Sequence, residues 1–199
     1  MAKGRIMIVR HAEKPGAPPP PHGVDATGGM DKESLIVRGW QRSGALACLF
    51  SAWGVAAHKG LAVPAAIYAT NPNGKSQRPE ETVSAVAARL NLAINLHFDE
   101  GQEVLLANAA MAAADHGPVL IAWRHETLPA IASRILGDRK SCPQHWPPAR
   151  FDLVWVFDHD GERWTFSQVP QMVLNGDQPT PIPMDQTAGA EPAPAATAS

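Results

Sequence analysis

Short apolar runs alternate along the chain with stretches in which apolar residues recur at helical spacing. The apolar runs predict buried strands at residues 5–9, 65–69, 94–98 and 118–123. The helical spacing predicts helices at residues 39–53, 79–90, 102–115 and 127–136. Strands that alternate with helices favour a mostly parallel sheet covered on both faces, which is a three-layer α/β/α sandwich.

The first predicted helix carries its apolar residues on one face. Leu46, Leu49, Phe50 and Trp53 share that face and are expected to be buried. Cys48 lies in the same apolar pattern and is expected to be a core residue.

Two further segments differ from this alternation. FDLVWVFD (151–158) and RWTFSQV (163–169) are typical of a β-hairpin closed by HDGE. Residues 15–30 contain PGAPPPPHG and predict a long loop, because consecutive prolines fit neither a helix nor a central strand. Beyond residue 176 the composition shifts to Pro, Ala, Thr and Gln. We therefore expect one domain over residues 1–176 and a disordered tail over residues 177–199.

Composition excludes several classes of function. The formal net charge is −2 and no basic run occurs, so a nucleic-acid partner is not expected. No stretch approaches the roughly 20 apolar residues of a membrane helix, and no signal peptide is recognised, so a cytoplasmic protein without a membrane partner is expected. Two cysteines form neither a disulfide framework nor a metal-binding motif, and no cofactor or metal is expected.

Cationic and titratable residues follow three of the predicted strands. Arg10 and His11 follow the strand at 5–9, Arg124 and His125 follow the strand at 118–123, and Arg78 lies in the region after 65–69. A single histidine after a strand is usually only a polar loop residue. Because ligands of open α/β sheets bind beyond the carboxyl ends of the strands, this convergence instead indicates a site for an oxyanion such as phosphate. Neutral histidine adds a nucleophile and a proton carrier.

Four segments, in order, resemble the histidine phosphatase superfamily, whose fold is phosphoglycerate mutase-like. RHAEK (10–14) resembles the Arg-His signature of that family, and SLIVRGWQRSGAL (34–46) resembles the segment that opens its first helix. SQRPEETVSAVAARL (76–90) is similar to the Ser-x-x-Arg-x-x-x-Thr stretch, and VLIAWRHETL (119–128) to the late strand that precedes the second catalytic histidine. The resemblance covers residues 5 to about 137.

The resemblance implies roles for individual residues. It implies that His11 attacks phosphorus and carries the phosphoryl group, while Arg10, Arg78 and His125 surround the equatorial oxygens. No metal is needed in this scheme. The expected activity is a metal-independent phosphatase acting on a phosphomonoester.

The sequence offers three candidates for the residue that donates a proton to the leaving oxygen. Glu126, directly after the second histidine, is the preferred acid, and Glu100 and Glu103 are the alternatives. Glu103 is expected to face solvent at the start of a helix, whereas Glu13 is expected to be a structural or orienting partner of the nucleophile.

Other questions stay open at this stage. Arg124 departs from the family pattern, which has a small or neutral residue there, and either joins the phosphate pocket or turns away into a salt bridge. A phosphomutase of the same superfamily and a non-catalytic module that binds a phosphorylated ligand are the alternative functions. The substrate is a phosphorylated small molecule or a phosphoprotein, and the oligomeric state is unknown.

Overall fold

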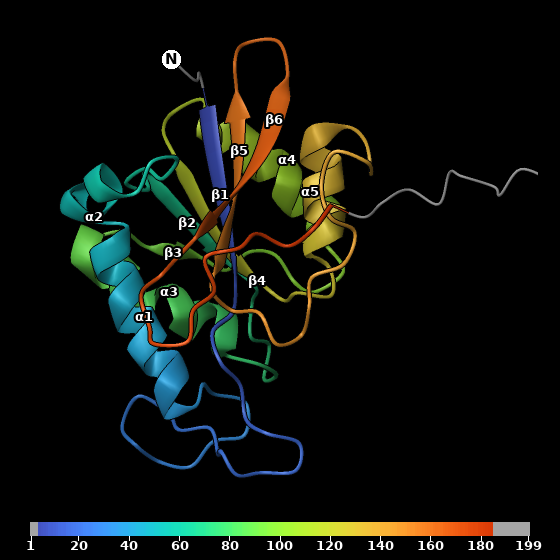
Figure 1. Cartoon of the computed structure of the whole chain (residues 1–199). Helices are drawn as coiled ribbons and strands as arrows, with labels where there is room; N and C mark the ends of the chain where they lie inside the picture. Colours follow the sequence, from blue (N-terminus) through green and yellow to red (C-terminus); the bar gives the residue numbers. More distant parts are fainter. Residues whose placement is uncertain (1–3, 185–199) are drawn as a thin grey trace, which may run out of the picture.

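The computed structural model describes residues 4–184, and these build one six-stranded sheet flanked by helices (Figure 1). The strands are β1 Gly4–Arg10, β2 Ala66–Ala69, β3 Ile94–Asn95, β4 Val119–Trp123, β5 Leu153–His159 and β6 Trp164–Pro170. The helices are α1 Val37–Leu49, α2 Ala52–Ala57, α3 Arg78–Leu90, α4 Glu103–Ala114 and α5 Leu128–Leu136.

The sheet has the strand order β3-β2-β4-β1-β5-β6. β3, β2, β4 and β1 run parallel to one another. β5 pairs antiparallel with β1, and β5 and β6 form an antiparallel hairpin at one edge of the sheet. Figure 1 shows α1, α2 and α3 on one side of the sheet and α4 and α5 on the other. The predicted three-layer architecture with a mostly parallel sheet is therefore confirmed.

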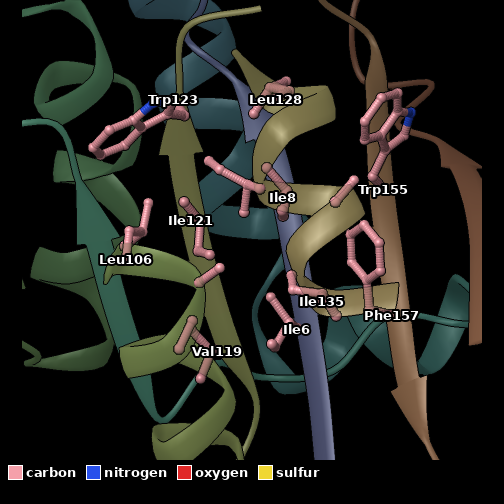
Figure 2. Packing of buried hydrophobic residues seen from close by; sticks show 14 of the residues in the cluster. Ile6, Ile8, Leu106, Val119, Ile121, Trp123, Leu128, Ile135, Trp155 and Phe157 are labelled. Carbon is pink, nitrogen blue, oxygen red and sulfur yellow. The ribbon is translucent and has the colours of Figure 1, made fainter. Parts of the chain in front are cut away.

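Alternate residues of the central strands belong to two separate hydrophobic cores, one on each face of the sheet. In β1, Ile6 and Ile8 join the core beneath α4 and α5, and Met7 and Val9 join the core beneath α1 and α3. Figure 2 shows the first of these cores, where side chains of β1, β4 and β5 pack beneath α5. Both faces of β1 and β4 are buried, which explains why their sequences are continuous apolar runs. Packing on both faces also holds the ends of these strands rigidly.

The helix predicted over residues 39–53 is confirmed up to Leu49 and is wrong only in its last four residues. α1 ends at Leu49, and Ser51 adopts an extended backbone and caps a separate helix, α2, by accepting a hydrogen bond from Gly54 N. This break changes the helix direction, so Trp53 is 87 % exposed instead of buried. Cys48 is also exposed rather than part of the core.

The ends of other elements differ in smaller ways. The strand predicted over residues 94–98 is reduced to Ile94–Asn95. Residues 177–182 pack against the domain, with Ile182 buried, so the packed chain extends beyond residue 176. The remainder of the expected tail, residues 185–199, lies outside the described residues. In the part of the chain that the structure describes, no helix is both long and apolar enough to cross a membrane.

Candidate active site

A pocket of about 490 Å³ opens at the edge of the sheet where the parallel strands end. Its walls come from the segments that follow β1, β2 and β4, together with the start of α3. Five of the residues singled out from the sequence line it, namely His11, Arg78, Glu100, Arg124 and Glu126, whereas Arg10 and His125 are buried beside it and are not among the lining residues. In Figure 1 this edge lies at the lower end of the sheet, where β1 runs into the long loop that precedes α1. Segments that follow three of the strands thus bring His11, Arg78 and Arg124 to one pocket at this edge.

His11 lies at the bottom of this pocket and is held in one orientation. Its Nδ1 lies 2.8 Å from the carbonyl oxygen of Ala12. Because a carbonyl oxygen only accepts hydrogen bonds, Nδ1 carries the proton of the neutral ring and Nε2 keeps its lone pair. Burial, helped by the positive charges of Arg10 and Arg78, lowers the pKa of His11 to about 3, although the hydrogen bond to Ala12 acts in the opposite direction. The ring is thus a neutral imidazole at neutral pH.

Arg10 is completely buried beside His11. Its Nη1 donates hydrogen bonds to the carbonyl oxygens of Pro148, at 2.6 Å, and Arg150, at 2.9 Å. Its Nε and Nη2 have no hydrogen-bond partner among the described residues. Burial lowers its pKa to about 10, which still leaves it charged at neutral pH. A buried cation with two unused donors is the arrangement that an oxyanion would complete.

Arg78 is the first residue of α3 and is held by the end of the long loop before α1. Its Nη2 donates to the carbonyl oxygen of Lys32 at 2.6 Å, and its Nε donates to Ser34 O at 3.4 Å. Its Nη2 also lies 3.6 Å from a carboxylate oxygen of Glu33. The end of the long loop before α1 therefore positions one of the cations of the pocket.

His125 and Glu126 lie in contact after the end of β4, without a hydrogen bond from the ring Nδ1 to any of the described residues. Nδ1 of His125 lies 3.0 Å from Oε2 of Glu126. Burial lowers the pKa of His125 to about 4, and the charge of Arg10 acts in the same direction. Burial alone would raise the pKa of Glu126, but hydrogen bonds from its own backbone amide and from Arg124 outweigh this and lower it. Glu126 is consequently ionised in the unliganded pocket.

Arg124 satisfies both alternatives left open by the sequence. It lines the pocket, and its guanidinium also forms salt bridges with Glu100 and, at 3.4 Å, with Glu126. Glu100 itself lines the pocket. The three side chains form one charged cluster at the pocket wall.

Glu103 does not face solvent as predicted. It is only 7 % exposed and accepts a 3.2 Å hydrogen bond from the indole Nε1 of Trp123. Trp123 is the last residue of β4, so Glu103 supports the core behind the site and is not among the residues that line the pocket.

Glu13 is a structural partner, as predicted. Its carboxylate is buried and accepts hydrogen bonds from Arg38 and Arg42 of α1.

Two residues of the site were missed by the sequence analysis. Thr70 follows β2, lines the pocket and is 7 % exposed, and its hydroxyl has no partner in residues 4–184. Phe151, assigned from the sequence to a strand, instead places its ring 3.8 Å from the guanidinium carbon of Arg10 and 6.2 Å from the ring of His11. The position of Thr70 directly after a buried strand was an available signal, whereas the stacking of Phe151 was not.

Comparison with solved structures finds the same fold in several other proteins. SixA of Agrobacterium tumefaciens, described as a candidate phosphohistidine phosphatase, matches with a TM-score of 0.52 at 18 % identity, covering 84 % of this chain and 98 % of that one. The α-ribazole phosphatase of Shigella flexneri matches with a TM-score of 0.52 at 12 % identity, covering 82 % and 94 %. YhfR of Bacillus stearothermophilus matches with a TM-score of 0.51 at 15 % identity, covering 85 % and 97 %.

The other two comparisons found no match: no family model matches the sequence, and no curated protein does. The similarity to the solved structures shows that the chain has the phosphoglycerate mutase-like fold that was expected from the sequence. SixA and the α-ribazole phosphatase share this fold with the chain at low sequence identity.

Proposed function

We propose that this protein is a metal-independent phosphomonoesterase that acts through a phosphohistidine intermediate on His11. The observation that carries the proposal is the neutral, oriented imidazole of His11 in a pocket beside the buried Arg10 with its two unused donors. A neutral nucleophile, held in place and surrounded by fixed cations, is what in-line displacement at a phosphoryl group requires.

In the first step, Nε2 of His11 attacks phosphorus, and the bond from phosphorus to the ester oxygen breaks. Arg10, Arg78 and His125 stabilise the charge on the equatorial oxygens. Arg124 lies at the pocket wall, paired with Glu100 and Glu126. In the second step, water attacks the phosphohistidine, releases inorganic phosphate and restores neutral His11. The cationic side chains supply the charge neutralisation, so no metal ion takes part in either step.

Glu126 is the proposed acid that protonates the departing oxygen. In the unliganded pocket its pKa is lowered, which disfavours this role. A bound phosphate dianion acts in the opposite direction, because a neighbouring negative charge raises the pKa of a carboxyl group. Proton uptake by Glu126 is therefore coupled to substrate binding. Glu100 is the alternative donor because it also lines the pocket.

The lining of the pocket favours a hydrophilic leaving group. Apart from two prolines, all the described residues of the lining are polar or ionisable, and they include Asn71, Asn73 and Asp99. Ligand pockets usually have mainly apolar and aromatic walls. We therefore propose a small phosphorylated metabolite with a polar alcohol, while a phosphoprotein side chain remains the competing substrate. The names of the similar structures, which include both kinds of phosphatase, support either one.

The phosphatase proposal is tested by phosphate release from p-nitrophenyl phosphate and from a panel of polar phosphomonoesters. Wild type should release phosphate in the presence of EDTA, and His11→Ala should not. Rapid quench with ³²P-labelled substrate should trap an acid-labile phosphoenzyme in wild type alone. Equal rates for the two proteins would refute the assignment of His11.

The same assay separates the two alternative functions. Turnover that depends on a bisphosphate primer would indicate a phosphomutase. Phosphate binding without turnover or phosphoenzyme would indicate a binding module.

A further inference from the structure

A buried arginine on α1 connects the nucleophile loop with the last described part of the chain. Arg42 is 2 % exposed, and its Nε and Nη2 donate to the carboxylate of Glu13 at 2.8 to 3.1 Å. Its Nη2 and Nη1 also donate to the carboxylate of Asp177 at 2.8 and 3.2 Å, and Nη1 donates to Gln171 at 2.9 Å. All the guanidinium nitrogens are therefore engaged.

One end of this network lies directly beside the nucleophile. Glu13 follows His11 by two residues, and its carbonyl oxygen accepts a 3.1 Å hydrogen bond from Ile36 N just before α1. Gly39 of α1 allows the helix to press against the same backbone, since a Cβ there would lie 2.6 Å from Glu13 O. The Arg42–Glu13 contact thus fixes the chain that leaves His11 against a rigid helix.

The other end is a folded segment that follows β6. The carboxylate of Asp177 accepts hydrogen bonds from the backbone amides of Val173 and Leu174, which closes a compact turn. Gln171 donates to the carbonyl oxygens of Phe151 and Leu153, so the segment is also tied to the start of β5. Figure 1 shows this segment crossing from β6 to α1 before it turns back.

The guanidinium of Arg42 and the carboxylate of Asp177 stay ionised although they are buried. Burial acts to lower the pKa of Arg42, but hydrogen bonds to Asp177 and Glu13 outweigh it and the pKa is raised. Burial would raise the pKa of Asp177, but Arg42 lowers it. Removing one carboxylate would leave a buried guanidinium with unused donors, which is costly and favours movement of the remaining partner, Glu13.

We propose that Arg42 and Asp177 are positioning residues for His11, so that docking of residues 171–177 on α1 is needed to align the nucleophile. This inference rests on the proposed phosphatase function. The two residues do not touch the pocket, because neither is among the residues that line it. Their influence passes through Glu13 and the backbone that joins it to His11.

Asp177→Asn is the test variant, because it keeps the size of the side chain and can still accept bonds from Val173 and Leu174. Asp177→Glu is the conservative control that keeps the charge. Asp158→Asn is the matched control, because Asp158 pairs with Arg5 at 2.6 Å at the opposite end of β1. Four quantities are measured for each protein: kcat, the inhibition constant of inorganic phosphate, the melting temperature, and the pH titration of the His11 ring by NMR.

Asp177→Asn should lower kcat about tenfold or more, because a small displacement of a reacting atom carries a large cost in rate. Phosphate inhibition should be unchanged, since Arg10 and Arg78 are untouched. The pKa of His11 should rise from about 3 towards its ordinary value as the ring gains contact with water. Asp177→Glu should restore most of kcat, and Asp158→Asn should lower the melting temperature alone.

A purely structural role for Asp177 predicts a different result. In that case Asp177→Asn would lower the melting temperature but leave both kcat and the titration of His11 as in wild type, and this would overturn the inference. If wild type shows no turnover, the phosphatase proposal fails, yet the titration of His11 still decides whether Asp177 positions the ring. Should Asp177→Asn fail to fold, Arg42→Lys provides the same measurements with the charge of the network retained.

Discussion

The backbone amide of Ala12 donates a 2.8 Å hydrogen bond to the hydroxyl of Thr82. The same hydroxyl donates at 2.6 Å to the carbonyl oxygen of Arg78, one turn earlier in α3. Thr82 is fully buried, so neither bond competes with water. One side chain therefore sets the distance between the loop that carries His11 and the helix end that carries Arg78.

Thr82→Val should uncouple these two parts of the site while preserving the shape of the side chain. The amide of Ala12 would lose its partner, and a buried unpaired donor costs about 1–3 kcal/mol of folding free energy. We expect that loss in urea unfolding, together with a lower kcat. Thr82→Ser retains the hydroxyl and should behave like wild type. A Thr82→Val protein with wild-type kcat would show that this link does not position the site.

The proton donor can be assigned from the pH dependence of variants. Glu126→Gln should slow the chemical step by about a hundredfold, in the range typical of general acid catalysis, with little change in phosphate inhibition. The alkaline limb of the kcat profile, where Glu126 loses the proton that it donates, should change with it. Because a good leaving group needs no protonation, the effect should be much smaller with p-nitrophenyl phosphate than with an alkyl phosphate.

Glu100→Gln is the matched comparison, because Glu100 also lines the pocket and pairs with Arg124. It should leave the chemical step largely intact. A slow Glu100→Gln protein beside an unaffected Glu126→Gln protein would transfer the role of the acid to Glu100.

Thr70 should contribute a hydrogen bond to the bound phosphate. Its buried hydroxyl lines the pocket and lacks a partner within residues 4–184. Thr70→Val should weaken inhibition by inorganic phosphate about three- to tenfold, since a net hydrogen bond contributes about 0.5–1.5 kcal/mol. Thr70→Ser should retain wild-type inhibition. Unchanged inhibition in Thr70→Val, measured beside the Ser variant, would place the bound phosphate away from this hydroxyl.

Stability should fall in mild acid because two buried histidines stay neutral in the folded protein. The pKa values of His11 and His125 are about 3 and about 4, below the ordinary 6.5. Below pH 6.5 the unfolded chain therefore binds protons that the folded protein does not bind, and the free energy of unfolding decreases as pH falls towards 4. Above pH 6.5 these two residues contribute no further dependence on pH.

This pH dependence is measured from unfolding curves between pH 7 and pH 4. The double variant His11→Gln/His125→Gln should show a flatter profile than wild type over that interval. An identical slope in both proteins would mean that the two histidines take up protons in the folded state, which would also contradict the neutral nucleophile.

The fold and most of the site could be read from local patterns. Apolar runs identified β1 and β4 because both faces of those strands are buried, and the residues after them marked one edge of the sheet. His11, Arg78, Arg124 and Glu126 were predicted in this way and do line a common pocket. The break at Ser51 was missed, because a periodic apolar pattern gives no sign that two short helices replace one.

The sequence by itself determined that the central strands are buried on both faces and that cationic residues follow their carboxyl ends, since both features are visible along a short stretch of chain. The tertiary structure alone decided the relationships between distant segments. Phe151 over Arg10, Glu103 beneath Trp123 and Asp177 on Arg42 each join residues more than 15 positions apart. Such contacts depend on how whole elements pack, because burial and pairing of side chains are settled only when the elements meet.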